Sequence, residues 1–288
     1  MRQPLLSSAA RVFRSRLPDA LNFHRMVVNT YFALTLIAAA AVVQTARAQA
    51  NNEQPVPTHS ELCAKADTLT HAAQRDCPDR VRELLATNGI DSKTGSESEA
   101  LTTAIRAGNK DIVEILIQAG APVNPSQTTL WPPLSDAAFT KHFDIMKLLL
   151  AAGAKVDAPD HHGLTLLVST GYFDPTVTTI LLDAGADPNA TDQQGESVLM
   201  KASAQGLKQS VKILIDHHAD VNRKDARGRT ALMHAAASHY SDAIPVLLEN
   251  GADPTARDNE GHSALDLADK SNNLGAIAML SLAVKRSR

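Results

Sequence analysis

A repeated pattern runs from near residue 60 to the end of this 288-residue chain, and it constrains the fold more than any other feature. A Gly-Ala pair, replaced once by His-Ala, follows a double aliphatic and begins at positions 120, 153, 185, 218 and 251. A second marker, Asp-x-x-Gly, begins at positions 160, 192, 225 and 258 and keeps the same phase. A period of roughly 33 residues is typical of arrays of small stacked modules. The span 60–288 would hold just under seven of them.

The best-preserved repeat, residues 225–257, predicts what each one forms. Thr230 is placed to cap a short helix whose apolar residues recur on one helical face. A second helix carries a similar stripe and ends at Gly251, because a left-handed cap is easiest without a Cβ. The segment Asp258–Gly261 then turns the chain into the next repeat. A single repeat has too few apolar side chains to offset the entropy of ordering its own length, so neighbours must stack on it.

The segments T-A-L-M-H-A-A (230–236) and L-L-E-N-G-A-D (247–253) resemble the T-P-L-H-x-A-A and L-L-x-x-G-A-D signatures of the ankyrin repeat family. The resemblance covers roughly residues 69–280. It implies an all-α ankyrin-repeat solenoid of about seven helix-turn-helix units with short β-hairpin-like turns. We place this domain at 60–288, with units near 60–93, 94–126, 127–159, 160–191, 192–224, 225–257 and 258–288.

The third and fourth units depart most from the pattern. The third has Pro132-Pro133 in place of its Thr-Pro step, and the fourth is one residue short. The fourth also has Val168-Ser169-Thr170-Gly171 where H-x-A-A belongs. At position 218 a histidine replaces the C-cap glycine, at a local cost of ~1 kcal/mol.

The N-terminal segment 1–48 predicts export. An apolar run at 31–43 is too short to span a bilayer, follows several arginines and precedes Ala46-Arg47-Ala48, a small-x-small cleavage site. We predict a signal peptide at 1–48, cleaved after Ala48, a flexible linker at 49–59, and a periplasmic or secreted mature protein with no membrane insertion. An uncleaved anchor is the alternative, and Met26 is an alternative start.

Charge and motifs narrow the function. Without the segment 1–48 the chain has 22 basic and 30 acidic residues, which argues against nucleic acid as a partner. No local signature of an enzyme occurs, so we predict no catalytic residues and no cofactor. Adjacent histidines such as His161-His162 cannot share a metal as an i, i+4 pair does. The Asp-x-x-Gly turns lack the ligand density of a calcium loop, so we predict no metal site.

Cys63 and Cys77 are the only cysteines. An oxidising compartment favours a disulfide between them. If residues 60–76 formed one helix, however, their Cα atoms would lie about 21 Å apart, whereas a bridge needs roughly 4.4 to 6.8 Å. A disulfide therefore requires the segment before Leu69 to fold back, and reduced cysteines remain an equal alternative.

Five of the ten aromatic residues lie between 131 and 173. In ankyrin-like arrays the equivalent positions line the hairpin tips and the concave side of the first helices. The resemblance thus implies an exposed strip that binds a partner protein, since tryptophan and tyrosine often dominate binding energy. Its members are Trp131, Phe139, His161, His162, Leu164, Tyr172 and Phe173. Alternatively, these bulky residues fill packing gaps in the irregular units, Phe143 above all.

Together these features predict a monomeric, non-enzymatic scaffold that binds an unidentified protein through the concave face and hairpin tips of its middle repeats. A small-ligand binder or enzyme with a site in the third and fourth repeats is one alternative, and a structural spacer of the cell envelope is another.

Overall fold

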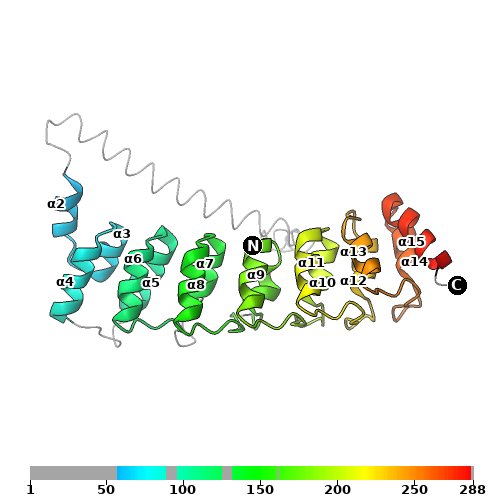
Figure 1. The fold of residues 1–288 in the computed structure, drawn as a ribbon, viewed down its shortest axis with the longest axis horizontal. Helices are drawn as coiled ribbons and strands as arrows, with labels where there is room; N and C mark the ends of the chain where they lie inside the picture. The colour runs from blue at the N-terminus through cyan, green and yellow to red at the C-terminus, as the bar shows by residue number, and fades with distance from the viewer. Residues whose placement is uncertain (1–56, 89–95, 125–131, 161, 287–288) are drawn as a thin grey trace, which may run out of the picture. The chain divides into compact units, whose positions relative to one another are not determined.

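A computed structural model of the chain describes residues 57–88, 96–124, 132–160 and 162–286 (Figure 1). The chain divides into two parts, Met1–Leu62 and Cys63–Arg288. The predicted signal peptide and residues 49–56 of the predicted linker lie outside the described residues. In the first part, Thr58 and Glu61 form a capping box at the start of α2 (His59–Ala64), with reciprocal bonds of 2.8 and 3.3 Å.

The described residues of the second part form seven consecutive helix pairs (Figure 1). We call the first helix of each pair inner and the second outer. The inner helices are α3 (Leu69–Gln74), α5 (Ser96–Ala107), α7 (Pro133–Phe139), the π-helical η1 (Leu167–Gly171), α10 (Val198–Ala204), α12 (Ala231–Ala237) and α14 (Ala264–Lys270). The outer helices are α4 (Pro78–Asn88), α6 (Lys110–Gln118), α8 (Phe143–Ala151), α9 (Pro175–Asp183), α11 (Lys208–Asp216), α13 (Ala243–Glu249) and α15 (Leu274–Arg286). The predicted all-α solenoid of about seven units is confirmed.

Neighbouring pairs stack helix on helix. Among the inner helices α3 contacts α5, α5 contacts α7, α10 contacts α12 and α12 contacts α14. The outer helices contact one another in chain order from α4 to α15. Their buried side chains form one hydrophobic cluster, made mainly of alanine and branched aliphatic residues. Each repeat thus completes its core with its neighbours, which is why the array rather than the single repeat is the folding unit.

The Asp-x-x-Gly segments are turns that the aspartates cap. At 160, 192, 225 and 258 one carboxylate oxygen accepts the backbone N–H groups two and four residues further on, at 2.8–3.0 Å. The glycine that follows is left-handed, and at Gly228 an added Cβ would lie 2.4 Å from Asn259 Oδ1. Beyond the turn, Thr230 Oγ1 accepts the N–H of Met233 at 3.4 Å. The predicted turn caps and the predicted helix N-cap are both confirmed.

Asparagine side chains link successive repeats at the hairpins. Asn222 accepts the N–H of Asp253 at 2.9 Å and donates to the carbonyl of Gly251, also at 2.9 Å. Asn124 and Asn189 make the same two bonds to the repeats that follow them. We call each of these two-way contacts an asparagine clamp. Because each clamp satisfies a backbone donor and an acceptor of the next repeat, it fixes the register between neighbours.

The fourth repeat is irregular where the sequence pattern fails. Its inner segment is the single π-helical turn η1, and residues 172–174 lead directly into α9. A π-turn closes five residues apart instead of four, so it changes the direction in which later side chains point. His218 replaces the C-cap glycine of its repeat, which is the other departure noted in the sequence. Its backbone is left-handed, with φ of +68°, a conformation that is unusual for a residue other than glycine.

Candidate interaction surface

Two phenylalanines are exposed on adjacent repeats. Phe139, at the C-terminal end of α7, is 41% exposed, and Phe173, just before α9, is 37% exposed. The exposed large hydrophobic residues of the described chain also include Tyr240, Leu274 and Leu282, which belong to the sixth and seventh repeats. We call Phe139 and Phe173 the phenylalanine pair.

An ion pair holds the two exposed segments together. Lys141 Nζ lies 2.8 Å from Asp174 Oδ2. Lys141 is two residues after Phe139, and Asp174 directly follows Phe173. Asp174 also caps α9 by accepting the N–H of Thr176 at 2.9 Å. Burial opposes ionisation of Asp174, but the hydrogen bonds from Lys141 and from backbone N–H groups prevail and lower its pKa. The contact therefore joins the inner-to-outer turns of the third and fourth repeats.

Tyr172 is a correction to the predicted strip. It is only 8% exposed, and its ring stacks on that of Phe173 with centroids 4.3 Å apart. Burial, together with the charges of Glu196 and Asp192, raises the pKa of its hydroxyl to about 12. The prediction placed Tyr172 from the equivalent positions of ankyrin-like arrays, whereas the inner segment η1 that precedes it is π-helical. Tyr172 thus packs against the ring of Phe173 and is not exposed to a partner.

Of the other predicted members, the described residues His162 and Leu164 do not form one continuous strip with the phenylalanine pair. His162 is exposed in the hairpin turn before η1, and Leu164 is half-buried against the core. Both precede η1 in the chain, whereas Phe173 follows it, so they lie at opposite ends of this inner segment. Trp131 and His161 lie outside the described residues. Phe143, expected to fill packing gaps, is half-buried and packs against the core.

A second inter-repeat ion pair lies between α5 and α7. The Nε and Nη2 atoms of Arg106 both lie 3.0 Å from Asp136 Oδ1. Asp136 Oδ2 is buried and accepts no hydrogen bond from the described residues. Burial raises the pKa of Asp136, and the contact with Arg106 offsets this only in part. Because α7 also ends at Phe139, this pair helps to fix the helix that carries one member of the phenylalanine pair.

Neither ion pair was predicted, although the sequence contains a signal for them. Lys141 and Asp174 are 33 residues apart, and Arg106 and Asp136 are 30 apart. Both separations are close to one repeat, so unlike charges at such a distance should meet on neighbouring repeats. Comparing charges repeat by repeat would have found these pairs.

The middle repeats do not gather titratable groups with shifted pKa values into one pocket of the described chain. Asp136 faces Arg106, and Tyr172 lies near Asp192 and Glu196. Burial raises the pKa of Asp157, which lies beside Asp187. An open depression of about 290 Å³ near Gly108 and Lys141 contains none of these three groups and does not contain Asp174, whose pKa is lowered. This arrangement gives no support to a small-ligand or catalytic site there.

One histidine-carboxylate group has a structural explanation. Ligand atoms of Glu196, Asp225 and His234 lie within 4.8 Å of one another. Asp225 Oδ2 lies 2.9 Å from His234 Nε2, and Oδ1 accepts two backbone N–H groups. Burial disfavours the charged form of Asp225, but these hydrogen bonds outweigh it and lower its pKa. Both oxygens of Asp225 thus serve the turn and the inner helix.

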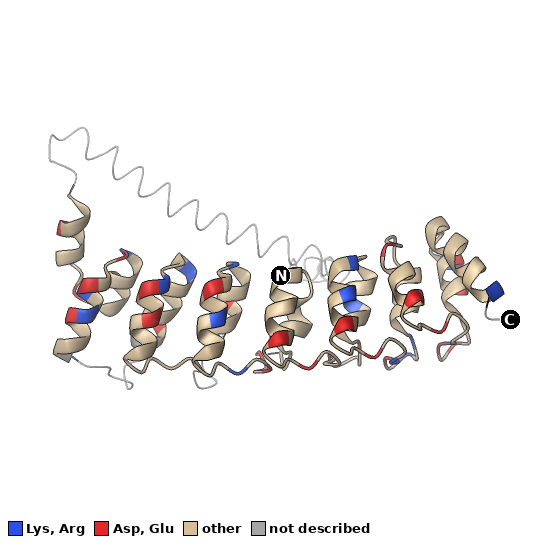
Figure 2. Ribbon diagram, viewed as in Figure 1, with Lys and Arg blue, Asp and Glu red and all other residues tan. Residues whose placement is uncertain are grey.

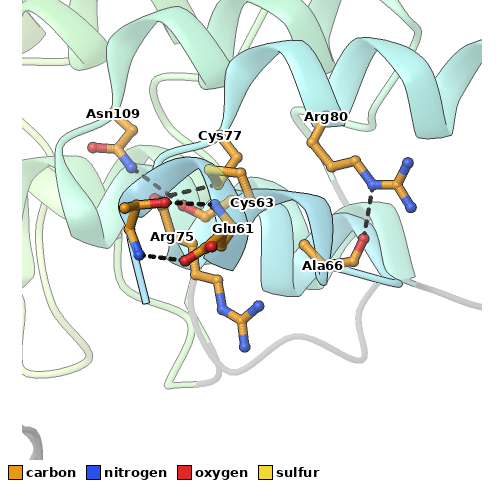
Figure 3. The surroundings of a disulfide bond; sticks show 9 residues. Glu61, Cys63, Ala66, Arg75, Cys77, Arg80 and Asn109 are labelled. Atoms are coloured by element: carbon orange, nitrogen blue, oxygen red, sulfur yellow. Dashed lines mark hydrogen bonds between the residues drawn. A yellow bond between two sulfur atoms is a disulfide. The ribbon is translucent and has the colours of Figure 1, made fainter. Parts of the chain in front are cut away.

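Cys63 and Cys77 form a disulfide with a Cα–Cα distance of 5.6 Å (Figure 3). The chain folds back between Cys63 and α3, as a bridge requires, and Cys77 lies directly before α4. Arg80 Nε donates to the carbonyl of Ala66 at 2.9 Å and holds the same connection. Of the two alternatives left open by the sequence, the disulfide is therefore present.

The outer helices α4, α6, α8 and α11 bear charges of both signs, α9 and α13 bear an acidic residue only, and acidic and basic residues both occur along the hairpin loops (Figure 2). No helix in the described part of the chain is long and apolar enough to cross a membrane. The basic hairpin residues of the last repeats are partly engaged within the array. Arg229 lies 3.4 Å from Asp258, and Lys224 donates to the carbonyl of Arg257 at 3.0 Å.

Comparison with known proteins matches the chain to ankyrin repeats. A family model of three ankyrin repeats matches residues 69–160 and again 164–258. The chain is 30% identical over 141 residues to ankyrin repeat, SAM and basic leucine zipper domain-containing protein 1 of Ornithorhynchus anatinus, covering 47% of this chain and 28% of the relative. It is 34% identical over 105 residues to cyclin-dependent kinase inhibitor 2A of Monodelphis domestica, covering 36% and 61%. It is 33% identical over 107 residues to an ankyrin repeat-containing protein of Treponema pallidum (strain Nichols), covering 36% of each. The chain thus matches only part of each relative's length.

Proposed function

This chain belongs to the ankyrin repeat family, and from that premise we propose that it is an exported, non-enzymatic scaffold that binds a partner protein through its third and fourth repeats. Ankyrin repeats generally mediate binding between proteins, and rigid stacked helices present side chains with little ordering cost on association. The partner contact is centred on the phenylalanine pair, with Lys141 and Arg106 beside it. His162 and Leu164, before η1, form a separate part of the proposed contact at the hairpin tip, and Trp131 and His161, which lie outside the described residues, are proposed members as well.

The observation that carries this proposal is the exposure of the phenylalanine pair on two repeats joined by an ion pair. Aromatic side chains bury large areas at interfaces and are enriched among the residues that dominate binding energy. Exposed aromatic residues near one another on a rigid surface indicate a binding site. The stacked Tyr172 and the Lys141–Asp174 contact hold the two rings in place, which lowers the entropic cost of binding.

The names of two relatives fit this class of function. One is an inhibitor of cyclin-dependent kinases, and another combines ankyrin repeats with other domains. Because ankyrin folds serve unrelated partners, they support protein binding in general and name no partner for this chain.

Affinity capture with matched variants tests the binding site. The purified chain is immobilised and incubated with an envelope fraction and with culture medium of the producing organism. We expect the Phe139→Ser, Phe173→Ser double variant to lose at least 90% of the captured partner, as loss of ~2 kcal/mol or more would give. The control is Leu274→Ser with Leu282→Ser, which removes two exposed apolar side chains elsewhere and should retain capture. Equal capture by all three chains would refute the site.

Export is a second component of the proposal, supported by the leader pattern at 1–48 and by the disulfide. Disulfides persist mainly in oxidising compartments. We expect the product released by the producing cells to begin at Gln49 and to contain the Cys63–Cys77 bridge, as N-terminal sequencing and non-reducing peptide mass mapping would show. A full-length chain with two free thiols in the cytosolic fraction would contradict export.

A further inference from the structure

The outer helix of the seventh repeat, α15, has no charged residue before Lys285 and Arg286 in its last turn. Its first, fifth and ninth residues are Leu274, Ala278 and Leu282, and all three are exposed. Leu274 is 72% and Leu282 59% exposed. These positions lie four residues apart, so they form one stripe along the helix, which we call the α15 stripe.

Counterpart helices show that stacking does not cover these positions. In α6 the first, fifth and ninth residues are Lys110, Glu114 and Gln118, and in α11 they are Lys208, Lys212 and Asp216. All six are exposed, although each of these helices has stacked neighbours on both sides. In the arrangement of α6 and α11, a further repeat stacked on α15 would leave the stripe in water. Exposed leucines at positions that carry charged or amide groups in α6 and α11 indicate a surface that another molecule covers.

The order of side chains along the stripe is self-complementary. Leu274 and Leu282 flank Ala278 at equal spacing, and Gly275 and Ser281 beside them are also small. When two copies cross in antiparallel orientation at Ala278, Leu274 of each copy meets Leu282 of the other. A two-fold interface requires this kind of pattern, and rows spaced four residues apart pack in the commonest class of helix pair.

Charges at the two ends of α15 favour the same orientation. Its last turn carries Lys285 and Arg286, and the helix itself contains no acidic residue. Asp269, which is exposed, precedes the turn into α15. In an antiparallel pair the cations of one copy approach the Asp269 carboxylate of the other. An anionic membrane would attract one end of the helix and repel the other.

We propose that the protein forms a two-fold symmetric dimer through the α15 stripe, with the two α15 helices antiparallel and crossing at Ala278. The interface is small and built on a single helix from each copy, so the dissociation constant lies on the order of 10–100 μM, as for weak interfaces. This dimer replaces the monomer predicted from the sequence. It leaves the phenylalanine pair accessible, because that pair lies on the third and fourth repeats.

Sedimentation velocity over a concentration series tests the dimer. The sample is the purified full chain in the form that producing cells release. We expect reversible dimerisation, and Leu274→Ser with Leu282→Ser should raise the dissociation constant at least tenfold without changing the thermal unfolding midpoint. The matched control, Phe139→Ser with Phe173→Ser, should dimerise normally. A chain that stays monomeric at concentrations of about 100 μM would overturn the proposal.

Cysteine cross-linking tests the orientation. The two native cysteines pair with each other, so a single introduced thiol reports on the dimer alone. We expect Ala278→Cys to form a covalent dimer under mild oxidation and Leu274→Cys alone to form little. A mixture of Leu274→Cys and Leu282→Cys chains should form mixed dimers. Efficient cross-linking of Leu274→Cys to itself would contradict the antiparallel arrangement.

A charge swap separates this dimer from attachment to a membrane. Lys285→Glu with Arg286→Glu should weaken dimerisation about tenfold, and adding Asp269→Lys should restore part of it, since each copy again meets opposite charge at that position. Vesicles of phosphatidylglycerol and phosphatidylcholine provide the other arm. Binding to these vesicles that is lost in the Leu274→Ser, Leu282→Ser variant, without dimerisation in solution, would identify a membrane surface instead and overturn the proposal. Retained partner capture by that variant keeps the two proposals distinguishable.

Discussion

Adjacent residues Tyr172 and Phe173 have opposite roles. Tyr172 is buried and packs within the core, whereas Phe173 is substantially exposed and stacks on it. Tyr172→Ala removes a buried aromatic side chain and should lower the free energy of unfolding by about 3 kcal/mol. Phe173→Ala should lower it by less than about half as much, since much of that ring already contacts water. Urea unfolding monitored by circular dichroism measures both, and equal losses would contradict the orientation assigned to the two rings.

The shifted pKa values of two aspartates predict opposite effects of pH on the free energy of unfolding. Asp136 has a raised pKa when folded, so its ionisation costs stability as pH rises through that value. Asp225 has a lowered folded pKa, so it contributes stability above the unfolded value near 3.8, and this contribution is lost as pH falls through the folded value. Each carboxylate is expected to lose its effect on stability when it is protonated in both states.

The variants Asp136→Asn and Asp225→Asn test these signs against each other. Relative to the wild type, Asp136→Asn should become more favourable as pH rises above about 3.8, whereas Asp225→Asn should become less favourable as pH rises toward about 3.8 from below. Unfolding in urea at several pH values gives both differences. Parallel pH profiles for the two variants would contradict the assigned environments.

At the scale of the element, the hairpin between the third and fourth repeats lacks an asparagine clamp, although the hairpins on both sides of it have one. Asp157 occupies the clamp position between the third and fourth repeats and accepts the N–H of Asp187 at 3.3 Å. A carboxylate cannot donate to the carbonyl of Gly185 as an amide would, and the charge of Asp187 opposes its ionisation.

Asp157→Asn should therefore complete the set of clamps and raise the free energy of unfolding by about 1 kcal/mol. Asn222→Ala, at an existing clamp, should lower it by about 1 to 2 kcal/mol because two backbone groups lose their partner. Thermal unfolding of the two variants beside the wild type checks both. A destabilised Asp157→Asn would show that the fourth repeat does not admit the standard hairpin.

The same irregular repeat shows why the sequence predicts the elements better than the site. Helix caps, turns and the spacing of apolar residues recur along the whole array. An error in predicting one repeat therefore does not change the predicted array. The direction in which the Tyr172 side chain points depends on the single π-turn η1. Counting positions within the repeat cannot reveal this turn, because the fourth repeat is one residue short. The sequence also left undecided whether the disulfide forms, because its formation depends on how the chain reverses before Leu69.

For the whole molecule, the repeat sets the architecture and the departures from it set the candidate surfaces. The phenylalanine pair lies where the inner helices become irregular, and the α15 stripe lies where an outer helix loses its charges. The period predicts the stacking because every repeat shares the need for burial. The surfaces could be found only by comparing equivalent positions in the folded array, whereas comparing charges repeat by repeat in the sequence would have found the two ion pairs near the phenylalanines.

Hydrogen exchange of the chain with and without its captured partner is the most direct test of the proposed function, read by mass spectrometry at peptide resolution. The account predicts slower exchange in the complex at the end of α7 and at residues 171–174. At a concentration where the chain is monomeric, it predicts no change along α15. Protection restricted to the outer helices, with the segments around Phe139 and Phe173 unchanged, would contradict it.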